Sequence, residues 1–349
     1  MIDLKNLEPN KPKVDISEYT FLIYGKPKSG KTTLFYELAK EFYNGDLSKA
    51  LLIGLEKGYK ALNGIMAVSA SNYKDFEELV NQLIEDRNEL SFRMIGIDTL
   101  DVLYNYACDF VIRRERLARK DSKIKTIADI PWGAGYSMVG ELIEKNVNRL
   151  INAGYGLFLI SHNTEKKITQ RDGKEYDQTT VSLPTRARNI FINMSDFIIF
   201  VDIEKAKEGN KLVDNRYIYF RSDGDIEAGS RFQNVPDRIE YDAKLFLETF
   251  KIAVESNFED IEEMKKARVE QAEEKEKSVQ DYIESEKKID VEAMIEKVAE
   301  AIKGVGKEIK VIIQERFKEK YDTHNYKKFT GEQLVEALQL VEEIKKEKE

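Results

Sequence analysis

The stretch GKPKSGKTT, residues 25–33, constrains the fold of this chain more than any other part of its sequence. It follows the short apolar run FLIY and precedes LFYELAKEFY, whose apolar residues recur at helical spacing. Its two glycines permit the backbone of a tight turn between a buried strand and a helix. Such a turn directs backbone amides and the helix N-terminus toward one point, where phosphate can bind. The sequence therefore predicts an α/β fold around a phosphate-binding loop.

The stretch fits G-x-x-x-x-G-K-[ST] without a mismatch, so we expect it to bind the phosphates of ATP. Lys31 is expected to place its charge near the β- and γ-phosphates. Thr32 is expected to offer its hydroxyl to Mg²⁺, with phosphate oxygens and water completing the coordination shell. The predicted nucleotide contacts are Gly25, Lys26, Pro27, Lys28, Ser29, Gly30, Lys31, Thr32 and Thr33.

From residue 19 to about residue 250, short apolar runs alternate with amphipathic stretches of helical length. This alternation is typical of an α/β fold with a mostly parallel sheet between helices. Strands are expected at residues 21–24, 50–55, 93–98, 155–161, 197–203 and 217–222, and helices at 33–43, 73–83 and 138–151. The expected segments are an N-terminal extension (1–18), an ATPase core (19–250), a charged helical linker (251–289) and a small helical module (290–349).

The C-terminal module regains apolar periodicity after the charged linker. One helical face is expected to contain Val291, Ile295, Val298 and Ile302, before Gly304 and Gly306 interrupt it. A later helix is expected to begin at FTGEQL, with Thr330 and Gln333 as reciprocal capping partners.

Composition excludes several classes of protein. The formal net charge of −8 argues against wholesale coating of nucleic acid, although single segments are basic. The sequence contains no apolar run of the roughly 18–20 residues that a membrane span needs. Cys108 is the single cysteine, so no internal disulfide forms, and the N-terminus lacks a secretory signal. We therefore expect a cytoplasmic protein.

Two carboxylates follow other expected strands. Asp98 ends the run RMIGID and is expected to hold Mg²⁺ directly or through water. Glu56 lies just past ALLIGL, at the edge where open α/β sheets bind ligands. It is either the group that activates the attacking water or an ordinary turn carboxylate. Asp101 is interpreted as a helix cap or a surface charge.

The order of these stretches resembles the RecA-type ATPase core over roughly residues 15–250. Within that group the chain is most similar to phage-encoded nucleotide-binding proteins that act as single-strand-annealing recombinases. The resemblance rests on FLIYGKPKSGKTT, LLIGLEKG, MIGIDTL, PWGAGY, GLFLISHNTEKK and EAGSRFQNVPDRI.

This resemblance implies that Glu56 activates water. It also implies that His162 or its neighbour Asn163 senses the γ-phosphate and couples it to a DNA-binding loop. The chain departs from RecA in carrying SHN where RecA has an asparagine-glutamine pair, and in lacking an evident N-terminal oligomerisation helix.

RecA-type folds place DNA on two loops, one after the Asp98 strand and one after the sensor strand. Both stretches are basic here, at residues 111–136 and 166–188. Cations that follow phosphates, with an aromatic platform, are typical of single-strand binding. Trp132 is either that platform or a packing residue under the loop. The expected DNA contacts are Arg113, Arg114, Arg116, Arg119, Lys120, Trp132, Lys166, Lys167, Arg171, Arg186 and Arg188.

An arginine acting on a neighbouring subunit's nucleotide is also expected of a RecA-like oligomer. Arg231 is the preferred candidate and Arg221 the other one. The alternative for Arg231 is a salt bridge to nearby acids.

Together these features predict a Mg²⁺-dependent ATPase that binds single-stranded DNA and promotes annealing in phage recombination as a ring or filament. The C-terminal module is expected to recruit a single-stranded-DNA-binding protein or an exonuclease. One alternative is a ParA-like partition ATPase on duplex DNA, because Lys26 lies five residues before Lys31. Another is a non-hydrolysing scaffold that ATP only organises.

Overall fold

The computed structural model describes residues 10–169, 173–208, 211–258 and 260–348. The chain divides into two compact units, Met1–Glu276 and Lys277–Glu349. The first unit contains the sheet and the second is helical. The segment boundaries expected after residues 18, 250 and 289 stay predictions.

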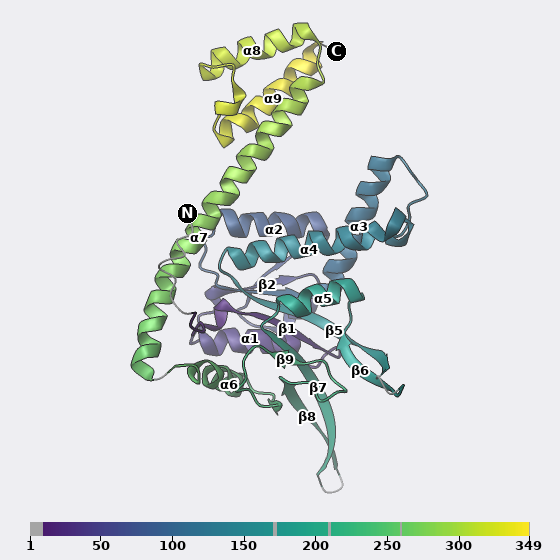
Figure 1. Ribbon diagram of the computed structural model, residues 1–349, viewed down its shortest axis with the longest axis vertical. Helices are drawn as coiled ribbons and strands as arrows, with labels where there is room; N and C mark the ends of the chain where they lie inside the picture. The colour runs from purple at the N-terminus through teal and green to yellow at the C-terminus, as the bar shows by residue number, and fades with distance from the viewer. Residues whose placement is uncertain (1–9, 170–172, 209–210, 259, 349) are drawn as a thin grey trace. The chain divides into compact units, whose positions relative to one another are not determined.

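The first unit is built on a sheet with the strand order β10-β8-β7-β1-β5-β4-β2-β3 (Figure 1). The pairs that join β7, β1, β5, β4, β2 and β3 are parallel, whereas β8 and β10 add to the β7 edge in antiparallel fashion. This confirms the predicted α/β class with a mostly parallel sheet. The strands are β1 Thr20–Gly25, β2 Ala50–Gly54, β3 Met66–Ser69, β4 Met94–Asp98, β5 Gly156–Thr169, β6 Glu175–Val181, β7 Phe197–Glu208, β8 Lys211–Tyr219, β9 Gly229–Ser230 and β10 Arg238–Glu240.

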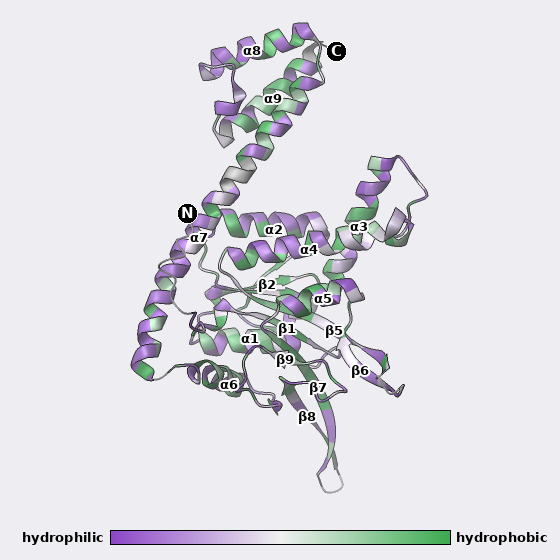
Figure 2. Cartoon of the chain, viewed as in Figure 1, coloured by the Kyte–Doolittle hydropathy of each residue, from purple (hydrophilic) through white to green (hydrophobic). Residues whose placement is uncertain are grey.

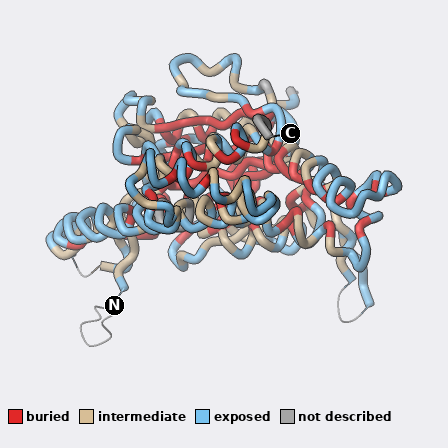
Figure 3. The backbone as a smooth tube through the Cα atoms, turned by 90° about the horizontal axis from the view of Figure 1, so that it is seen from above, coloured by how far each residue is buried: buried red, intermediate tan, exposed pale blue. Residues whose placement is uncertain are grey.

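Helices cover both faces of this sheet (Figure 1). One face is covered by α1 (Lys31–Phe42) and α6 (Ala243–Glu255), and the other by α2 (Tyr73–Glu85), α3 (Leu100–Arg119), α4 (Ala134–Asn152) and α5 (Thr185–Met194). Because both faces are covered, β1 and β4 are buried along their whole length, and Figure 3 shows buried segments at the centre. The short 3₁₀ helices are η2 Ile16–Glu18, η3 Leu47–Lys49, η4 Lys57–Ala61, η5 Ile127–Asp129, η6 Pro131–Gly133 and η7 Tyr326–Lys328.

Aromatic stacking holds the centre of the sheet against α1 and α6. The ring of Phe21 lies 4.6 Å from that of Phe158 and 4.9 Å from that of Phe197, both in stacked geometry. These three rings belong to adjacent strands and face the same side as Phe246 of α6. Burial of this layer fixes the register that brings the strand ends together.

The strand register places the candidate site at the carboxyl edge of the sheet. Gly25 at the end of β1 pairs with His162 of β5, and Gly54 at the end of β2 pairs with Asp98 of β4. The strand β5 separates β1 from β4. Residues from four distant stretches therefore meet at one edge, as open α/β sheets require of a ligand site.

Both basic segments that we expected to be loops are largely regular structure, and this corrects the prediction. The first continues α3 to Arg119, because Leu103, Ala107 and Val111 recur at helical spacing and are buried. In the second, β5 runs on to Thr169 and pairs with β6, and α5 follows. The β7 strand likewise extends past the predicted residue 203 to Glu208 and pairs with β8.

The second unit contains its own hydrophobic core. It is formed by the end of α7 (Ile261–Lys303), by α8 (Lys307–Tyr321) and by α9 (Gly331–Lys348), around buried Val298, Phe317 and Leu334. The predicted face of Val291, Ile295 and Ile302 packs against this core, and the break at Gly304–Gly306 is present.

The predicted capping pair at the start of α9 is confirmed. The Thr330 amide donates to Gln333 Oε1 at 3.0 Å, and the Gln333 amide donates to Thr330 Oγ1 at 3.3 Å.

Hydrophilic residues dominate the first half of α7, which is helical as predicted (Figure 2). Within the described part of the chain, no helix combines the length and the apolar character needed to cross a membrane.

Candidate active site

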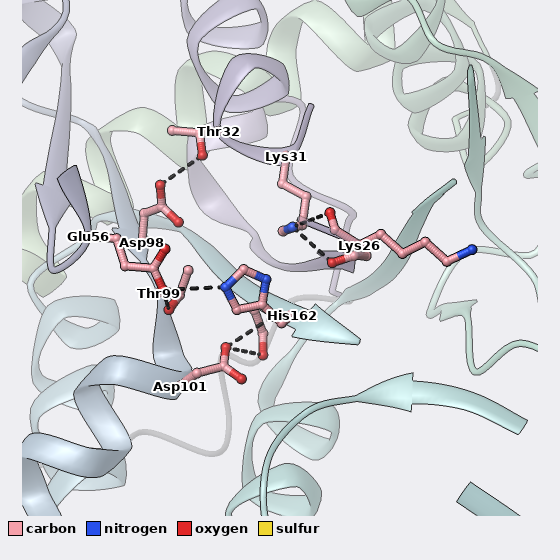
Figure 4. A network of polar contacts seen from close by, with 10 residues as sticks. Lys26, Lys31, Thr32, Glu56, Asp98, Thr99, Asp101 and His162 are labelled. Carbon is pink, nitrogen blue, oxygen red and sulfur yellow. Dashed lines mark hydrogen bonds and ion pairs between the residues drawn. The ribbon is translucent and has the colours of Figure 1, made fainter. Parts of the chain in front are cut away.

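A cavity of about 520 Å³ lies at the carboxyl edge of the sheet, against the start of α1. It brings together five residues whose roles were predicted from sequence: Lys31, Thr32, Glu56, Asp98 and His162. Figure 4 shows how most of their side chains converge. The full lining is Pro27, Lys28, Gly30, Lys31, Thr32, Thr33, Glu56, Gly58, Ala61, Leu62, Asp98, Thr99, His162 and Arg216.

Two glycines shape the loop that borders this cavity. Gly25 has φ 156°, and a Cβ there would lie 2.3 Å from the carbonyl oxygen of Val201. Gly30 has φ 109°, and a Cβ there would lie 3.0 Å from the Tyr241 hydroxyl. Gly30 is also the N-cap residue of α1, so the loop leads directly into that helix. The unpaired amides of the first helical turn therefore border the cavity, as phosphate binding requires.

Lys31 is a buried cation held by the loop itself. Its Nζ donates to the carbonyl oxygens of Gly25 and Lys26, each at 2.9 Å, and its residue is 6% exposed. Burial lowers the pKa of Lys31, and the nearby carboxylates of Asp98, Asp101 and Glu56 partly oppose that shift. A cation removed from water in this way favours an anionic ligand.

Thr32 and Asp98 form the predicted metal-side pair. The Thr32 hydroxyl donates to Asp98 Oδ2 at 2.8 Å, and Asp98 is 4% exposed. Burial raises the pKa of Asp98, while the hydrogen bond from Thr32 lowers it.

This pair fits Mg²⁺ bound together with a nucleotide. Within the described residues, no group of three or more His, Cys, Asp or Glu side chains could hold a metal ion. A hydroxyl and a carboxylate beside a phosphate-binding loop leave most of an octahedral shell to phosphate oxygens and water, which is how Mg²⁺ is usually bound. When bound, the ion would neutralise charge on the phosphates.

Glu56 lies in the same network and accepts from two sides. Its Oε1 accepts from the Thr99 hydroxyl at 3.0 Å and lies 3.3 Å from His162 Nε2 (Figure 4). Its side chain is 41% exposed, so the carboxylate remains accessible to water. A carboxylate oriented in this way beside bound phosphate can accept a proton from an attacking water, and that role stays a prediction.

Asp101 has a role that the sequence did not reveal. Its Oδ2 accepts from the Ser161 hydroxyl at 2.8 Å and from the His162 amide at 3.0 Å. It therefore anchors the end of β5 where the strand delivers His162 to the cavity. Reading Asp101 as a helix cap or surface charge was wrong, because its partners are about 60 residues away. The partnership of Thr99 with Glu56 was also missed, for the same reason.

The two arginines expected to act in trans lie outside the cavity lining. Arg231 Nε lies 3.4 Å from Asp196 Oδ1, and its guanidinium donates to the carbonyl oxygen of Asn193 at 3.1 Å. This is the salt bridge considered as the alternative for Arg231. Arg221 Nε donates to the carbonyl oxygen of Val235 at 2.9 Å. A trans-acting role for either residue stays a prediction.

The first basic segment ends in an exposed aromatic side chain. Trp132 is 101% exposed, so the packing alternative for this residue is wrong. Arg116 is engaged internally, because its Nε and Nη2 donate to the carbonyl oxygen of Ile124 at 3.0 and 2.7 Å. Arg119 pairs with Glu115 at 2.9 Å, and Arg114 lies 3.6 Å from the same residue. Arg113 and Lys120 lie on the last turns of α3 and at its C-cap.

The second basic segment contributes fewer free cations than expected. Lys166 and Lys167 lie on β5, and Lys167 pairs with Glu175 across the hairpin at 3.0 Å. Arg186 lies 3.9 Å from Glu141. Arg171 falls outside the described residues.

Arg188 corrects the predicted interface. Its side chain is only 11% exposed, it lies 3.8 Å from Glu227, and it donates to the Thr180 hydroxyl at 3.2 Å. This largely enclosed, paired guanidinium joins α5 to β6, so it is not a surface contact.

Comparison with known proteins places this geometry in context. Residues 17–232 match a family model described as AAA domain. The SPbeta prophage-derived uncharacterized protein YorG of Bacillus subtilis (strain 168) is 23% identical over 206 residues, which are 57% of this chain. The chain spans 59% of the length of that relative. The crystal structure of the KaiC-like protein PH0186 from Pyrococcus horikoshii OT3 has 15% identity and a TM-score of 0.34, and the match covers 65% of this chain and 90% of that one.

Proposed function

The chain belongs to the AAA domain family, and from that premise we propose that it is a Mg²⁺-dependent ATPase that binds single-stranded DNA and promotes strand annealing as an oligomer. The family and the RecA-like P-loop fold support nucleotide-dependent ATPase activity in general. In the proposal, Lys31 and the loop amides bind the phosphates, Thr32 and Asp98 hold Mg²⁺, and Glu56 activates water.

One observation carries the DNA part of this proposal. The helix α3 begins at Leu100, directly after Asp98 and Thr99 of the cavity, and ends at Arg119 in the basic segment. Its 20 residues span about 30 Å at 1.5 Å per residue. One helix therefore joins the nucleotide site to the basic segment 111–136. A shift of its first turn, beside the γ-phosphate, can move its last turn as well.

In the proposal, Trp132, which follows α3 in the same basic segment, is the aromatic platform. Trp132 stands on η6 with φ 63°, a conformation that an L-residue adopts only where its neighbours hold it. In the segment that precedes it, Ile124, Ile127 and Ile130 are buried, and Thr126 and Asp129 form a capping box. A fully exposed indole on this backbone can stack on a base.

Biological context adds a further element to the proposal. The Bacillus subtilis relative is described as prophage-derived, which supports a phage or prophage origin. The role that we propose is recombination of phage DNA in the cytoplasm of a bacterial host. The second unit, with its own core, would then recruit a single-stranded-DNA-binding protein or an exonuclease.

The single tryptophan of the chain offers a direct test of DNA binding. Single-stranded oligo(dT) should quench the intrinsic fluorescence of Trp132, and duplex DNA should do so much less. Neutralising four to six phosphates predicts a slope of log affinity against log salt of roughly −3 to −4. A slope near zero, or no quenching, would remove the DNA claim.

Substitution sharpens the same test. Trp132→Ala should weaken binding of a labelled oligonucleotide by about 1–3 kcal/mol, and Trp132→Phe should retain part of that energy. Leu212→Ala, which removes another exposed apolar side chain on β8, 66% exposed, is the control and should leave affinity unchanged. ATP turnover measured without DNA, with single strands and with duplex completes the test. Turnover indifferent to DNA would point to another activity of the AAA domain family.

A further inference from the structure

The candidate active site contains an arginine that no sequence pattern predicted. Arg216 of β8 lines the cavity together with the phosphate loop. It is exposed, and within the described part of the chain no carboxylate lies at ion-pair distance from its guanidinium. Glu37 of α1 is near enough to feel its charge but forms no ion pair with it. An arginine left without a carboxylate partner at the wall of an anion-binding cavity is available to a ligand.

Tyr241 fixes Arg216 relative to the phosphate loop. The Tyr241 amide donates to the carbonyl oxygen of Arg216 at 2.9 Å, and the Tyr241 hydroxyl donates to the carbonyl oxygen of Gly30 at 2.8 Å. The guanidinium lies over the Tyr241 ring at 5.8 Å from its centroid. Gly30 is itself packed on that ring, so β8 and the loop are joined through one half-buried side chain. The position of Arg216 therefore follows the position of the loop.

Arg216 lies at a different part of the cavity wall from the residues expected around the γ-phosphate. That end is marked by Glu56, Asp98 and His162, which form one hydrogen-bonded and charged network. Arg216 instead lies near Gly30 and near Glu37, which is one helical turn beyond Thr33 on α1. The phosphate loop contacts the α- and β-phosphates on the side away from the terminal one.

We propose that Arg216 is a nucleotide-binding residue that binds the α-phosphate, opposite the γ-phosphate network. The inference rests on nucleotide binding at the phosphate loop. It assigns the residue a role in affinity for ATP and ADP alike. A guanidinium donates charge-assisted hydrogen bonds to phosphate oxygens, which are among the stronger polar contacts in proteins.

Calorimetric titration of the full-length protein with Mg²⁺-ADP and with a non-hydrolysable Mg²⁺-ATP analogue tests this inference. Arg216→Ala should raise the Kd of both ligands by about tenfold, to a similar extent. Arg216→Lys should recover part of the lost affinity, because lysine keeps the positive charge but not the planar guanidinium that binds phosphate through two hydrogen bonds. Lys207→Ala removes one exposed cation from β7 of the same hairpin and should change neither Kd, which makes it the matched control.

Other outcomes would overturn the assignment. A loss confined to the ATP analogue would place Arg216 at the γ-phosphate. If Arg216→Ala weakened binding of adenosine diphosphate but not of guanosine or cytidine diphosphate, Arg216 would be a residue that stacks on the base. Unchanged affinity in Arg216→Ala, with normal binding by the unmodified protein, would refute this inference alone. Failure of the unmodified protein to bind any nucleotide would instead refute the proposed function.

Discussion

Replacing Asp101 with alanine tests the most specific claim about how the site is supported. Asp101 Oδ2 accepts two hydrogen bonds at the end of β5, from the Ser161 hydroxyl at 2.8 Å and from the His162 amide at 3.0 Å. Asp101→Ala would leave both donors without this acceptor. His162, whose Nε2 lies 3.3 Å from Glu56, would lose the anchor that fixes its backbone.

The size of the effect follows from these two hydrogen bonds. Hydrogen bonds to a charged group contribute about 1.5–3 kcal/mol each, and Ser161 is fully buried. Because Asp101 itself is partly exposed, water can satisfy some of the lost interaction. We therefore expect the free energy of unfolding to fall by about 2–4 kcal/mol. We also expect kcat for ATP to fall about tenfold, while the Kd for ADP stays within about twofold, since the phosphate loop is untouched.

Urea denaturation and steady-state turnover measure these two effects. Ser161→Ala, alone and combined with Asp101→Ala, supplies the control, because the double variant removes the orphaned hydroxyl together with its acceptor. The destabilisation in the double variant should be smaller than the sum of the single losses by about 1 kcal/mol. Additive losses, or an Asp101→Ala protein of unchanged stability and kcat, would refute the reasoning.

Three further perturbations test other parts of the molecule. Burial raises the pKa of Asp98, so the folded chain binds that proton more tightly than the unfolded chain, and stability falls as pH rises above the ordinary value of about 3.9. Asp98→Asn should therefore stabilise the nucleotide-free protein against urea at pH 7, by an amount that shrinks as the pH falls toward 4; destabilisation at pH 7 would contradict this. Thr330→Ala should destabilise the second unit by about 1 kcal/mol, seen as faster hydrogen exchange in α9, whereas Thr330→Ser should not. Lys26 is 63% exposed and lies 3.8 Å from Asp202, so Lys26→Ala should change turnover and oligomer size less than about twofold. Loss of dimerisation in that variant, measured by light scattering, would favour the partition alternative.

Local patterns in the sequence predicted most of the fold. The apolar runs that became β1, β2, β4 and the start of β5 needed no long-range information, because buried parallel strands are apolar on both faces. Beyond residue 260, local pattern predicted the helical face of Val291, Ile295, Val298 and Ile302 and the capping pair of α9. It did not single out α8, which contributes Ile313 and Phe317 to the same core. Prediction failed where helix or strand continued into charged sequence, as in α3 and in the β5–β6 hairpin. Charge is compatible with loop, helix and strand alike, so composition does not separate them.

The sequence by itself determined the phosphate loop and the identity of the groups around it. Lys31 and Thr32 follow from the spacing of the loop, while Glu56, Asp98 and His162 each follow an apolar strand. Parallel strands that end at one edge must bring such residues together. The roles expected of Glu56 and His162 came from the resemblance to the RecA-type core.

Only the tertiary structure decided what supports and completes the site. Asp101 meets β5 across 61 residues, and Arg216 reaches the cavity from β8 through Tyr241, which bonds to Gly30 across 211 residues. In the same structure Trp132 is fully exposed and the Arg188 side chain is only 11% exposed, although both were predicted to contact DNA. The physical reason is common to all four residues: a side chain's partner and its access to water depend on which distant segments pack beside it. No pattern confined to neighbouring residues contains that information.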